Sequence, residues 1–345
     1  MRALVLERAG EGMEPVLADV PAPALSSAAD VRIAMRAAAL NRLDVFVAGG
    51  LPGIPASYPH IVGADGAGVV ESVGADVTSV RPGDEVLFNP GTFCGECPPC
   101  RRGDEALCDR IAILGEHRSG TAAELVVLPA RNVAPAPAGW TWAERAALPV
   151  ATLTAWRMLS SKARLQPGET VLVWGAGGGV AQAAIQVAVH LGATVIATSS
   201  RSEGMERARQ LGATHVVNHD TEAVVAFVKG LTGRRGCEVV VDSVGEATWP
   251  SSLRLLARGG RMVVCGATSG PMVGLDARRL FWHQWSILGS SMASQAEFRE
   301  MMALAHSGKF QPVVDQVVPL AEGAKAYARL ARGEQVGKLV IEVTP

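Results

Sequence analysis

The chain has 345 residues, of which 48% are hydrophobic and 19% are charged, and its formal net charge is −1. This length predicts about two domains, and the composition supplies enough apolar side chains for large cores, which excludes an intrinsically disordered chain. Because no basic block stands out, the charge balance also argues against nucleic acid as a partner.

The first residues, MRALVLERAGEG, predict a strand and a turn rather than a targeting peptide, so we expect a cytoplasmic protein. Up to about residue 130, short β-type runs such as DVRIAMRAAAL, GADGAGVVESVG and TAAELVVLP are separated by glycine and proline. These runs predict a compact β-barrel-like domain. The character changes near Trp140, where TWAERAALPVATLTAWRMLSSKA has helical periodicity and an internal proline that divides it into two helical pieces.

From Glu169 onward, strands such as TVLVWG, TVIATSS, THVVN and CEVVVDSVG alternate with helices. This alternation is typical of a parallel sheet with helices on both faces. Residues 171–197 are the most apolar stretch, but a glycine cluster interrupts them, which favours a strand–helix–strand unit over a membrane span. We therefore expect an α/β domain over residues 151–289, with residues 290–345 returning to the domain formed by residues 1–150.

Four cysteines occur close together in the run CGECPPCRRGDEALC, and they are Cys94, Cys97, Cys100 and Cys108. Four thiolates from one short segment can surround a single metal ion tetrahedrally, without an open position for water or substrate. The spacing therefore predicts a structural zinc site rather than a catalytic one. Disulfides or free thiols are the alternatives, and disulfides fit less well because nothing at the N-terminus resembles a secretory signal.

A glycine-rich turn, AGGGVA, connects the strand TVLVWG to an apolar helix. Glycines permit a tight turn and let the backbone amides at a helix N-terminus approach a pyrophosphate. Ala181 stands where a third glycine is expected, and the pattern permits alanine there. A plain tight turn is the alternative, but the strand–turn–helix–strand context favours a dinucleotide site. The residues expected to hold the dinucleotide are Gly175, Gly177, Gly178, Gly179 and Val180.

The second strand of this domain ends in ATSSRS and lacks the acidic residue that holds the ribose 2′-hydroxyl of NAD. The hydroxyls of Ser199 and Ser200 and the guanidinium of Arg201 would instead favour a 2′-phosphate. We therefore predict that NADP(H) is preferred over NAD(H). His219, at the end of the third strand, could flank the same phosphate. The alternatives are a solvated Arg201 and a capping His219, and for His219 alone the capping role is favoured.

Together these motifs resemble the medium-chain dehydrogenase/reductase superfamily of zinc alcohol dehydrogenases and quinone oxidoreductases. The resemblance runs the length of the chain, through AALNRLDVFVAGG, GADGAGVVESVG, VRPGDEVLF, the four-cysteine loop, LPVATLTAWRML, the glycine turn and GKLVIEV. It implies an α/β protein with an N-terminal chaperonin-10-like β-barrel domain, a Rossmann domain and a substrate cleft between them. It also implies homodimers or homotetramers, built here through the strands GGRMVVCG and WSILGSS.

The resemblance breaks where alcohol dehydrogenases of this family bind a second, catalytic zinc. The family ligands are a cysteine, a histidine followed by glutamate, and a further cysteine. The matching positions here hold Asn41, Ala64 with Asp65, and Val150, which do not form a zinc site. His60 lies four residues too early to replace them. The segment LNRLD instead resembles the zinc-independent quinone and enone reductases, although these usually lack the four-cysteine loop.

Without a catalytic metal, hydrogen-bond donors must stabilise the charge that develops on the acceptor. The candidates are the Asn41 amide, Thr154 near the nicotinamide, and His117, whose loop lines the substrate pocket in relatives. The alternative for His117 is a loop histidine bonded to the backbone. Asp44 is a further catalytic candidate, although a structural carboxylate that orients its neighbours is the favoured interpretation. For Tyr58, packing is favoured over a place in the cleft.

We further expect four residues to contact the cofactor on the nicotinamide side, and they are Asp242, Gly245, Gly266 and Lys338. The main functional hypothesis is an NADPH-dependent reductase of quinones or α,β-unsaturated carbonyl compounds. An alcohol or aldehyde dehydrogenase of the same family and a non-catalytic NADPH-binding protein are the alternatives. The expected partner is a small carbonyl or quinone substrate, with neither nucleic acid nor a membrane involved.

Overall fold

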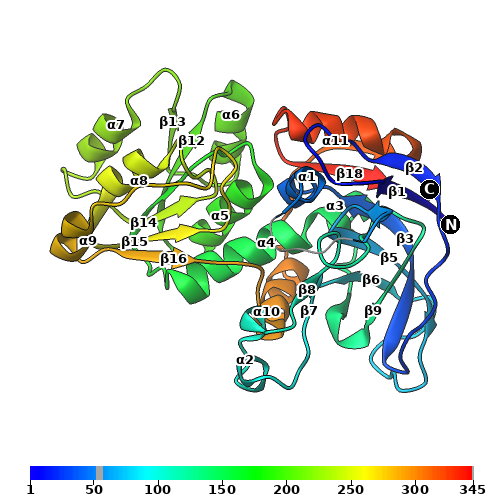
Figure 1. The fold of residues 1–345 in the computed structure, drawn as a ribbon. Coiled ribbons are helices and arrows are strands. Elements are labelled where there is room, and N and C mark those ends of the chain that lie inside the picture. The colour runs from blue at the N-terminus through cyan, green and yellow to red at the C-terminus, as the bar shows by residue number, and fades with distance from the viewer. Residues whose placement is uncertain (52–56, 344–345) are drawn as a thin grey trace. The chain divides into compact units, whose positions relative to one another are not determined.

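The computed structural model describes residues 1–51 and 57–343 (Figure 1). The chain divides into two compact units. The first consists of Met1–Val150 together with Ala293–Pro345, and the second consists of Ala151–Met292. The second unit is thus inserted into the sequence of the first.

The first unit is built mainly from short strands. They are β1 (Arg2–Leu6), β2 (Val16–Asp19), β3 (Asp30–Ala39), β4 (His60–Ile61), β5 (Asp65–Val73), β6 (Glu85–Phe88), β7 (Gly91–Thr92), β8 (Ala112–Ile113), β9 (Leu125–Pro129), β10 (Val133–Pro135), β17 (Val314–Pro319) and β18 (Lys338–Glu342). A seven-stranded sheet has the order β10-β6-β5-β3-β18-β17, with β9 also paired to β3. A three-stranded sheet has the order β2-β1-β4, and β7 pairs with β8.

The core of this unit lies on the inner faces of these sheets and includes Leu4, Ile33, Phe88 and Leu128, each at most 1% exposed. Strands β5 and β3 approach closely at Gly68. A Cβ atom there would lie 2.2 Å from the carbonyl oxygen of Ala34, so only glycine permits this pairing. The β-barrel-like domain expected from the alternating runs is confirmed.

Helices cover parts of this barrel. They are α1 (Arg42–Gly49), α2 (Pro98–Arg101), η1 (Glu105–Leu107), η2 (Ala130–Asn132), α3 (Trp142–Ala147), α10 (Gln295–His306), η4 (Leu320–Glu322) and α11 (Gly323–Ala331). Thr141 caps α3 and Ser294 caps α10, each in a reciprocal pair with a glutamate three residues later. A further helix, α4 (Pro149–Trp156), follows α3 and starts at the internal proline, so the expected division into two helical pieces is correct.

The last strand returns to the middle of the large sheet. β18 runs antiparallel to β3, with Val340 opposite Ala39, and β3 pairs on its other side with β5, where Ala39 is opposite Asp65. The start of β18 and the start of β5 therefore flank the same end of β3.

The second unit contains one parallel sheet with the order β13-β12-β11-β14-β15-β16. Its strands are β11 (Thr170–Val173), β12 (Thr194–Ser199), β13 (His215–Asn218), β14 (Cys237–Asp242), β15 (Leu256–Val264) and β16 (Ser286–Gly289). All five pairings are parallel. The order reverses direction at β11, which confirms the expected doubly wound Rossmann topology.

Helices connect the successive strands of this sheet. They are α5 (Gly179–His190), α6 (Ser202–Gln210), α7 (Val224–Leu231), α8 (Trp249–Leu255) and α9 (Ala277–His283), and a π-helical segment (Arg157–Lys162) precedes β11. Right-handed crossovers place α5 and α6 on one face and the other three on the opposite face (Figure 1). Helices α8 and α9 were not among the elements expected from the sequence. In the described part of the chain, no helix has the length and apolar character needed to cross a membrane.

Candidate functional site

Asp44 holds together the turn at the start of α1. Its Oδ2 atom accepts the N–H of Asn41 at 2.7 Å, and its Oδ1 atom accepts the N–H of Gly63 at 2.6 Å. The side chain is fully buried. Burial desolvates the carboxylate and raises the pKa of Asp44 to about 6, although the two N–H groups act in the opposite direction. Asp44 thus orients the backbone around Asn41, as its structural interpretation requires.

Asp65 is the centre of a buried polar cluster in the first unit. Its Oδ1 atom accepts the N–H of Val150 at 2.7 Å. Its Oδ2 atom accepts the ammonium of Lys338 at 2.8 Å and the amide of Asn41 at 3.0 Å. Lys338 also donates to Oδ1 of Asn41 at 2.5 Å, and the Asn41 amide donates to the carbonyl oxygen of Ala39 at 3.3 Å. We refer to Asn41, Asp65 and Lys338 as the lysine cluster.

The lysine cluster occupies the segments in which family ligands to a catalytic zinc were sought. Asn41, Asp65 and Val150 meet there, while Ala64 is fully buried and carries no donor atom. Across the described residues, the only group of three or more cysteine, histidine or acidic side chains placed to hold a metal ion is the four-cysteine group. The buried positive charge in this region is an ammonium group.

Lys338, expected among the cofactor contacts, is 5% exposed and lies in the first unit. Its side-chain partners, Asn41 and Asp65, are 297 and 273 residues away in the sequence. Sequence reasoning missed this cluster. The available signal was the occurrence of two oppositely charged residues at the starts of apolar strands, in GADGAG and GKLVIEV.

His117 lies in the loop after β8 and is bonded to that loop. Its Nδ1 atom accepts the N–H of Ile113 at 3.3 Å, so in this arrangement the proton of the neutral ring is on Nε2. Oε1 of Glu116 lies 3.8 Å from the same Nδ1 atom. Burial is the main cause that raises the pKa of Glu116. The Nε2–H group of His117 is the part of the ring that can donate outward.

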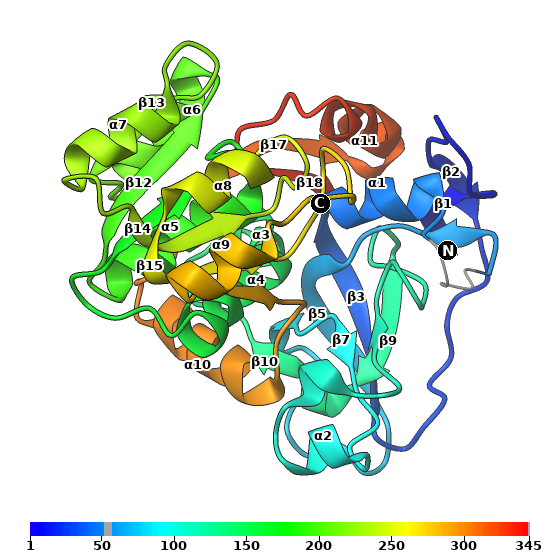
Figure 2. The same ribbon diagram turned by 60° about the vertical axis from the view of Figure 1, so that its left-hand side comes forward.

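The four cysteines form a lobe around α2 and η1, which extends from the lower end of the first unit in Figure 2. Their sulfur atoms all lie within 4.8 Å of one another. The Sγ atom of Cys94 is 3.8 Å from that of Cys100 and 3.5 Å from that of Cys108. A tetrahedron of Zn–S bonds about 2.3 Å long has S···S edges of about 3.8 Å, so the donor set and its spacing fit zinc. These separations exclude disulfides.

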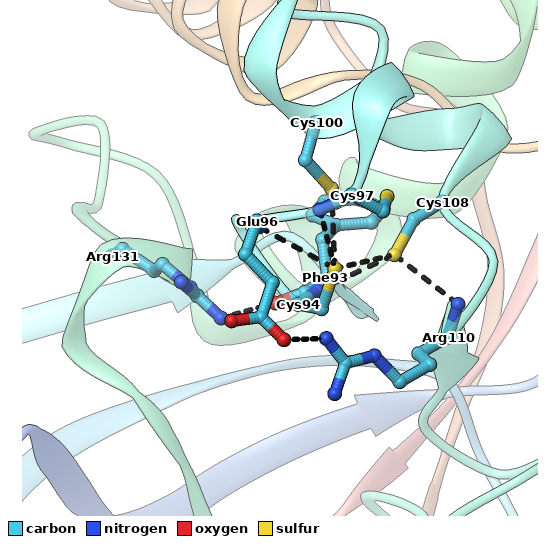
Figure 3. A network of polar contacts seen from close by, with 8 residues as sticks. All are labelled: Phe93, Cys94, Glu96, Cys97, Cys100, Cys108, Arg110 and Arg131. Atoms are coloured by element: carbon cyan, nitrogen blue, oxygen red, sulfur yellow. Dashed lines mark hydrogen bonds and ion pairs between the residues drawn. The ribbon is translucent and has the colours of Figure 1, made fainter.

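Backbone N–H groups of the lobe point at the sulfur atoms (Figure 3). Cys94 accepts from the N–H groups of Glu96 and Cys97, and Cys108 accepts from those of Cys94 and Arg110. The N–H of Cys97 is the main cause that lowers the pKa of the Cys94 thiol to about 6. Such donors favour thiolates, which are the form that binds a metal.

The glycine turn of the second unit presents a helix N-terminus. Gly175 has φ +70°, which favours glycine, and its N–H donates to Oγ1 of Thr198 at 3.2 Å. The first intrahelical bond of α5 runs from Gln182 to Gly178, so the N–H groups of Gly179 and Val180 precede it. These N–H groups suit an anion such as a pyrophosphate.

The residues expected to select the cofactor meet at the ends of β12 and β13. Ser199 is 5% exposed, and its hydroxyl exchanges hydrogen bonds with the backbone of Arg201, so it shapes this turn. The carbonyl oxygen of Ser200 accepts from Asn218 at 3.2 Å. His219 places Nδ1 3.1 Å from the Thr198 hydroxyl. Arg201 is exposed at the start of α6.

Asp242, expected to line the nicotinamide side, is fully buried and binds its own loop. Its carboxylate accepts from the N–H groups of Val244 and Gly245 and from the hydroxyls of Thr248 and Ser252.

The same network reaches the glycine turn through Trp174, whose Nε1–H donates to the Ser252 hydroxyl at 2.8 Å. Sequence reasoning did not find this connection between the ends of β11 and β14. Gly266 and Gly245 lie in close backbone contacts, because a Cβ atom on either would come within 3.0 Å of a carbonyl oxygen. Thr154 is buried on α4.

Two family models match the chain. The model described as the alcohol dehydrogenase GroES-like domain matches residues 27–138, and the zinc-binding dehydrogenase model matches residues 179–307. A zinc-type alcohol dehydrogenase-like protein of Schizosaccharomyces pombe is 33% identical over 91% of this chain and 91% of its own length. A quinone oxidoreductase of Pseudomonas aeruginosa is 32% identical over 92% of this chain and 93% of its own length. The crystal structure of a NAD-dependent alcohol dehydrogenase is 43% identical, with a TM-score of 0.93 and 100% coverage of both chains.

Proposed function

Because the chain belongs to the medium-chain dehydrogenase/reductase superfamily of oxidoreductases, we propose that it is an NADPH-dependent reductase of quinones or α,β-unsaturated carbonyl compounds that works without a catalytic zinc. The observation that carries this proposal is the lysine cluster. The side chains of Asn41 and Asp65 are hydrogen-bonded to each other and to the ammonium group of Lys338. The other two positions that would carry zinc ligands hold Ala64 and Val150.

The choice of acceptor follows from the strength of the available donors. The bound dinucleotide supplies a hydride, and negative charge then grows on the acceptor. One well-placed hydrogen-bond donor lowers the barrier by about 3–4 kcal/mol, which is less help than a divalent metal ion provides. Quinones and enones are electron-poor and delocalise the incoming charge, so they need less help than a simple ketone. His117 and the ammonium group of the lysine cluster are the proposed donors, with Thr154 as a further candidate.

The turnover test is a panel of acceptors offered with NADPH, alongside metal analysis of the purified protein. The proposal predicts oxidation of NADPH by quinones or enones and one zinc per chain, held by the four-cysteine lobe. Two metal ions per chain, with turnover that depends on the second, would contradict it. Zinc in the lobe is part of the proposal and is supported by the S···S spacing and the N–H···S bonds.

The proposed preference for NADP(H) is supported by the absence of an acidic residue at the end of β12 and by the presence there of Arg201, an exposed basic residue. Asp220 is an opposing charge, since its carboxylate lies 3.8 Å from Nε2 of His219. We expect Arg201→Ala to lower kcat/KM for NADPH about tenfold while leaving that for NADH nearly unchanged. Arg209→Ala, on the exposed side of the same helix, is the matched control. Equal losses with both cofactors would refute the assignment.

An alcohol dehydrogenase is the second candidate, and the 43% identity to a solved NAD-dependent alcohol dehydrogenase favours it. It predicts oxidation of alcohols with NAD and a second metal ion per chain. A non-catalytic NADPH-binding protein is the third candidate, and it predicts tight NADPH binding without turnover of any acceptor. The same acceptor and metal measurements separate all three.

A homodimer or homotetramer is proposed as the assembly. Strand β16 is the edge of the parallel sheet, and α9 immediately before it exposes Phe281 and Trp282, at 69% and 66%. Exposed aromatic side chains beside an unpaired strand edge are typical of an association surface. We expect the double variant Phe281→Glu/Trp282→Glu to shift the mass measured by light scattering toward the monomer, and an unchanged mass would place the interface elsewhere.

A further inference from the structure

The three N–H groups of the Lys338 ammonium are not all used within the fold. Two of them donate to Oδ1 of Asn41 at 2.5 Å and to Oδ2 of Asp65 at 2.8 Å. An ammonium group has three donors and no acceptor. Among the described residues, no acceptor for the third is found. A buried cation with an unused donor is held ready for a further acceptor.

In the same arrangement, Asn41 has no free N–H group to donate to such an acceptor. One N–H of its amide is directed to Oδ2 of Asp65 and the other to the carbonyl oxygen of Ala39. Its own oxygen faces the ammonium, which also fixes the orientation of the amide. Asn41 was expected to be one of the donors, but its contacts are those of a residue that orients Lys338.

Asp65 fixes the ammonium from the other side. The carboxylate is fully buried, and its second oxygen is held by the N–H of Val150. The charges of Asp65 and Lys338 compensate each other in a region from which water is excluded, which is the condition under which a buried ion pair is tolerated. A rigid ammonium of this kind needs no reorganisation when negative charge develops beside it.

We infer that Lys338 is the catalytic hydrogen-bond donor of this enzyme, and that Asn41 and Asp65 are its positioning residues. The inference rests on the proposed function, because it concerns the same reduction. Hydride adds to the electrophilic carbon of the acceptor, and the electron pair of the broken π bond moves to the conjugated oxygen. The third N–H of Lys338 stabilises that oxygen, and one proton from solvent completes the product. NADPH is oxidised as the acceptor is reduced.

The test uses the double variant Lys338→Met/Asp65→Asn in the full-length protein. Changing both residues avoids an unpaired buried carboxylate, which would by itself destabilise the fold. We expect kcat for an enone to fall about 100- to 1,000-fold, the range measured when one such donor is removed. The Kd for NADPH and the melting temperature should stay near the wild-type values. Lys338→Arg, which keeps the charge, should retain more activity than the double variant.

A purely structural role would lower activity equally with every acceptor. Donation to the developing oxyanion predicts that the loss is larger for an enone than for a quinone, which delocalises its charge more widely. The matched control is Lys325→Met/Glu322→Gln, which removes an exposed lysine–carboxylate pair at the start of α11 and should leave turnover unchanged.

The outcomes separate the two proposals. If the wild-type protein reduces none of the acceptors, the proposed function fails, and this inference fails with it. If the wild-type protein is active and the folded, NADPH-binding double variant retains kcat within threefold, only the role of Lys338 is refuted. Equal losses for quinone and enone refute it as well.

Discussion

Replacing Asp44 by asparagine measures the cost of burying its carboxyl group. Burial is the main reason why the pKa of Asp44 rises from 3.8 to about 6. Hydrogen bonds from Asn41 and Gly63 and the charge of Lys338 oppose the rise, whereas the charge of Asp65 adds to it. The folded protein therefore keeps the Asp44 proton at pH values at which the unfolded chain has released it.

The sign of the effect follows from the linkage between protonation and folding. Between about pH 4 and pH 6, the folded state binds more protons at Asp44 than the unfolded state does. This stabilising contribution is complete below about pH 4 and is lost as the pH rises through about 6. A shift of about two pKa units corresponds to about 3 kcal/mol of unfolding free energy, since each unit is worth about 1.4 kcal/mol.

The assay is urea unfolding of the wild-type protein and the Asp44→Asn variant across this pH range. An amide offers one oxygen where the carboxylate offers two, so the variant loses the bond to Asn41 or Gly63, which lowers its stability. The informative quantity is how the difference between the two proteins changes with pH. We expect it to be largest near pH 4 and to narrow by up to about 3 kcal/mol toward pH 7. A difference that is constant across the range would refute the raised pKa.

Three further predictions concern other parts of the molecule. Glu169→Gln should lower the unfolding free energy by about 2 kcal/mol, because it breaks a two-point ion pair in which the side chains of Glu169 and Arg261 are 20% and 18% exposed. Denaturant unfolding measures this loss, and a change below about 0.5 kcal/mol would contradict the prediction. Trp174→Phe should weaken NADPH binding about fivefold in calorimetry, the equivalent of about 1 kcal/mol, because it releases Ser252 from the glycine turn; unchanged affinity would contradict this. Treatment with a chelator should release one zinc ion per chain and speed the exchange of backbone amide hydrogens in residues 93–110. An unchanged exchange rate would show that the structure of the lobe does not depend on metal.

The fold was largely predictable because its signals are local. The alternation of strands and helices after Glu169 fixes a doubly wound sheet, since each parallel connection needs a crossover and the crossovers are right-handed. The proline before Val150 marks the start of α4 as expected, and the spacing of the four cysteines correctly predicted that their sulfur atoms lie together. Helices α8 and α9 were missed because they are short and their sequences lack a clear periodicity.

The polar clusters were not predictable because they depend on pairing between distant segments. Lys338 reaches Asp65 only because β18 and β5 lie on either side of β3, and neither sequence run indicates which strand it will join. The partner of Trp174 likewise depends on how α8 packs beneath β14. A search for charged residues inside apolar strands would have identified Asp65 and Lys338 as unusual, without revealing that they form a pair.

The position of β18 in the large sheet has a consequence for biosynthesis. A ribosome completes residues 151–292, with their own apolar core, well before it reaches Lys338. We therefore expect the inserted unit to fold first during translation. At that stage the barrel is incomplete, because β3 has not yet paired with β18 and the Asp65 carboxylate has not yet met Lys338. Nascent chains stalled before β18 should bind a dinucleotide yet show no oxidoreductase turnover.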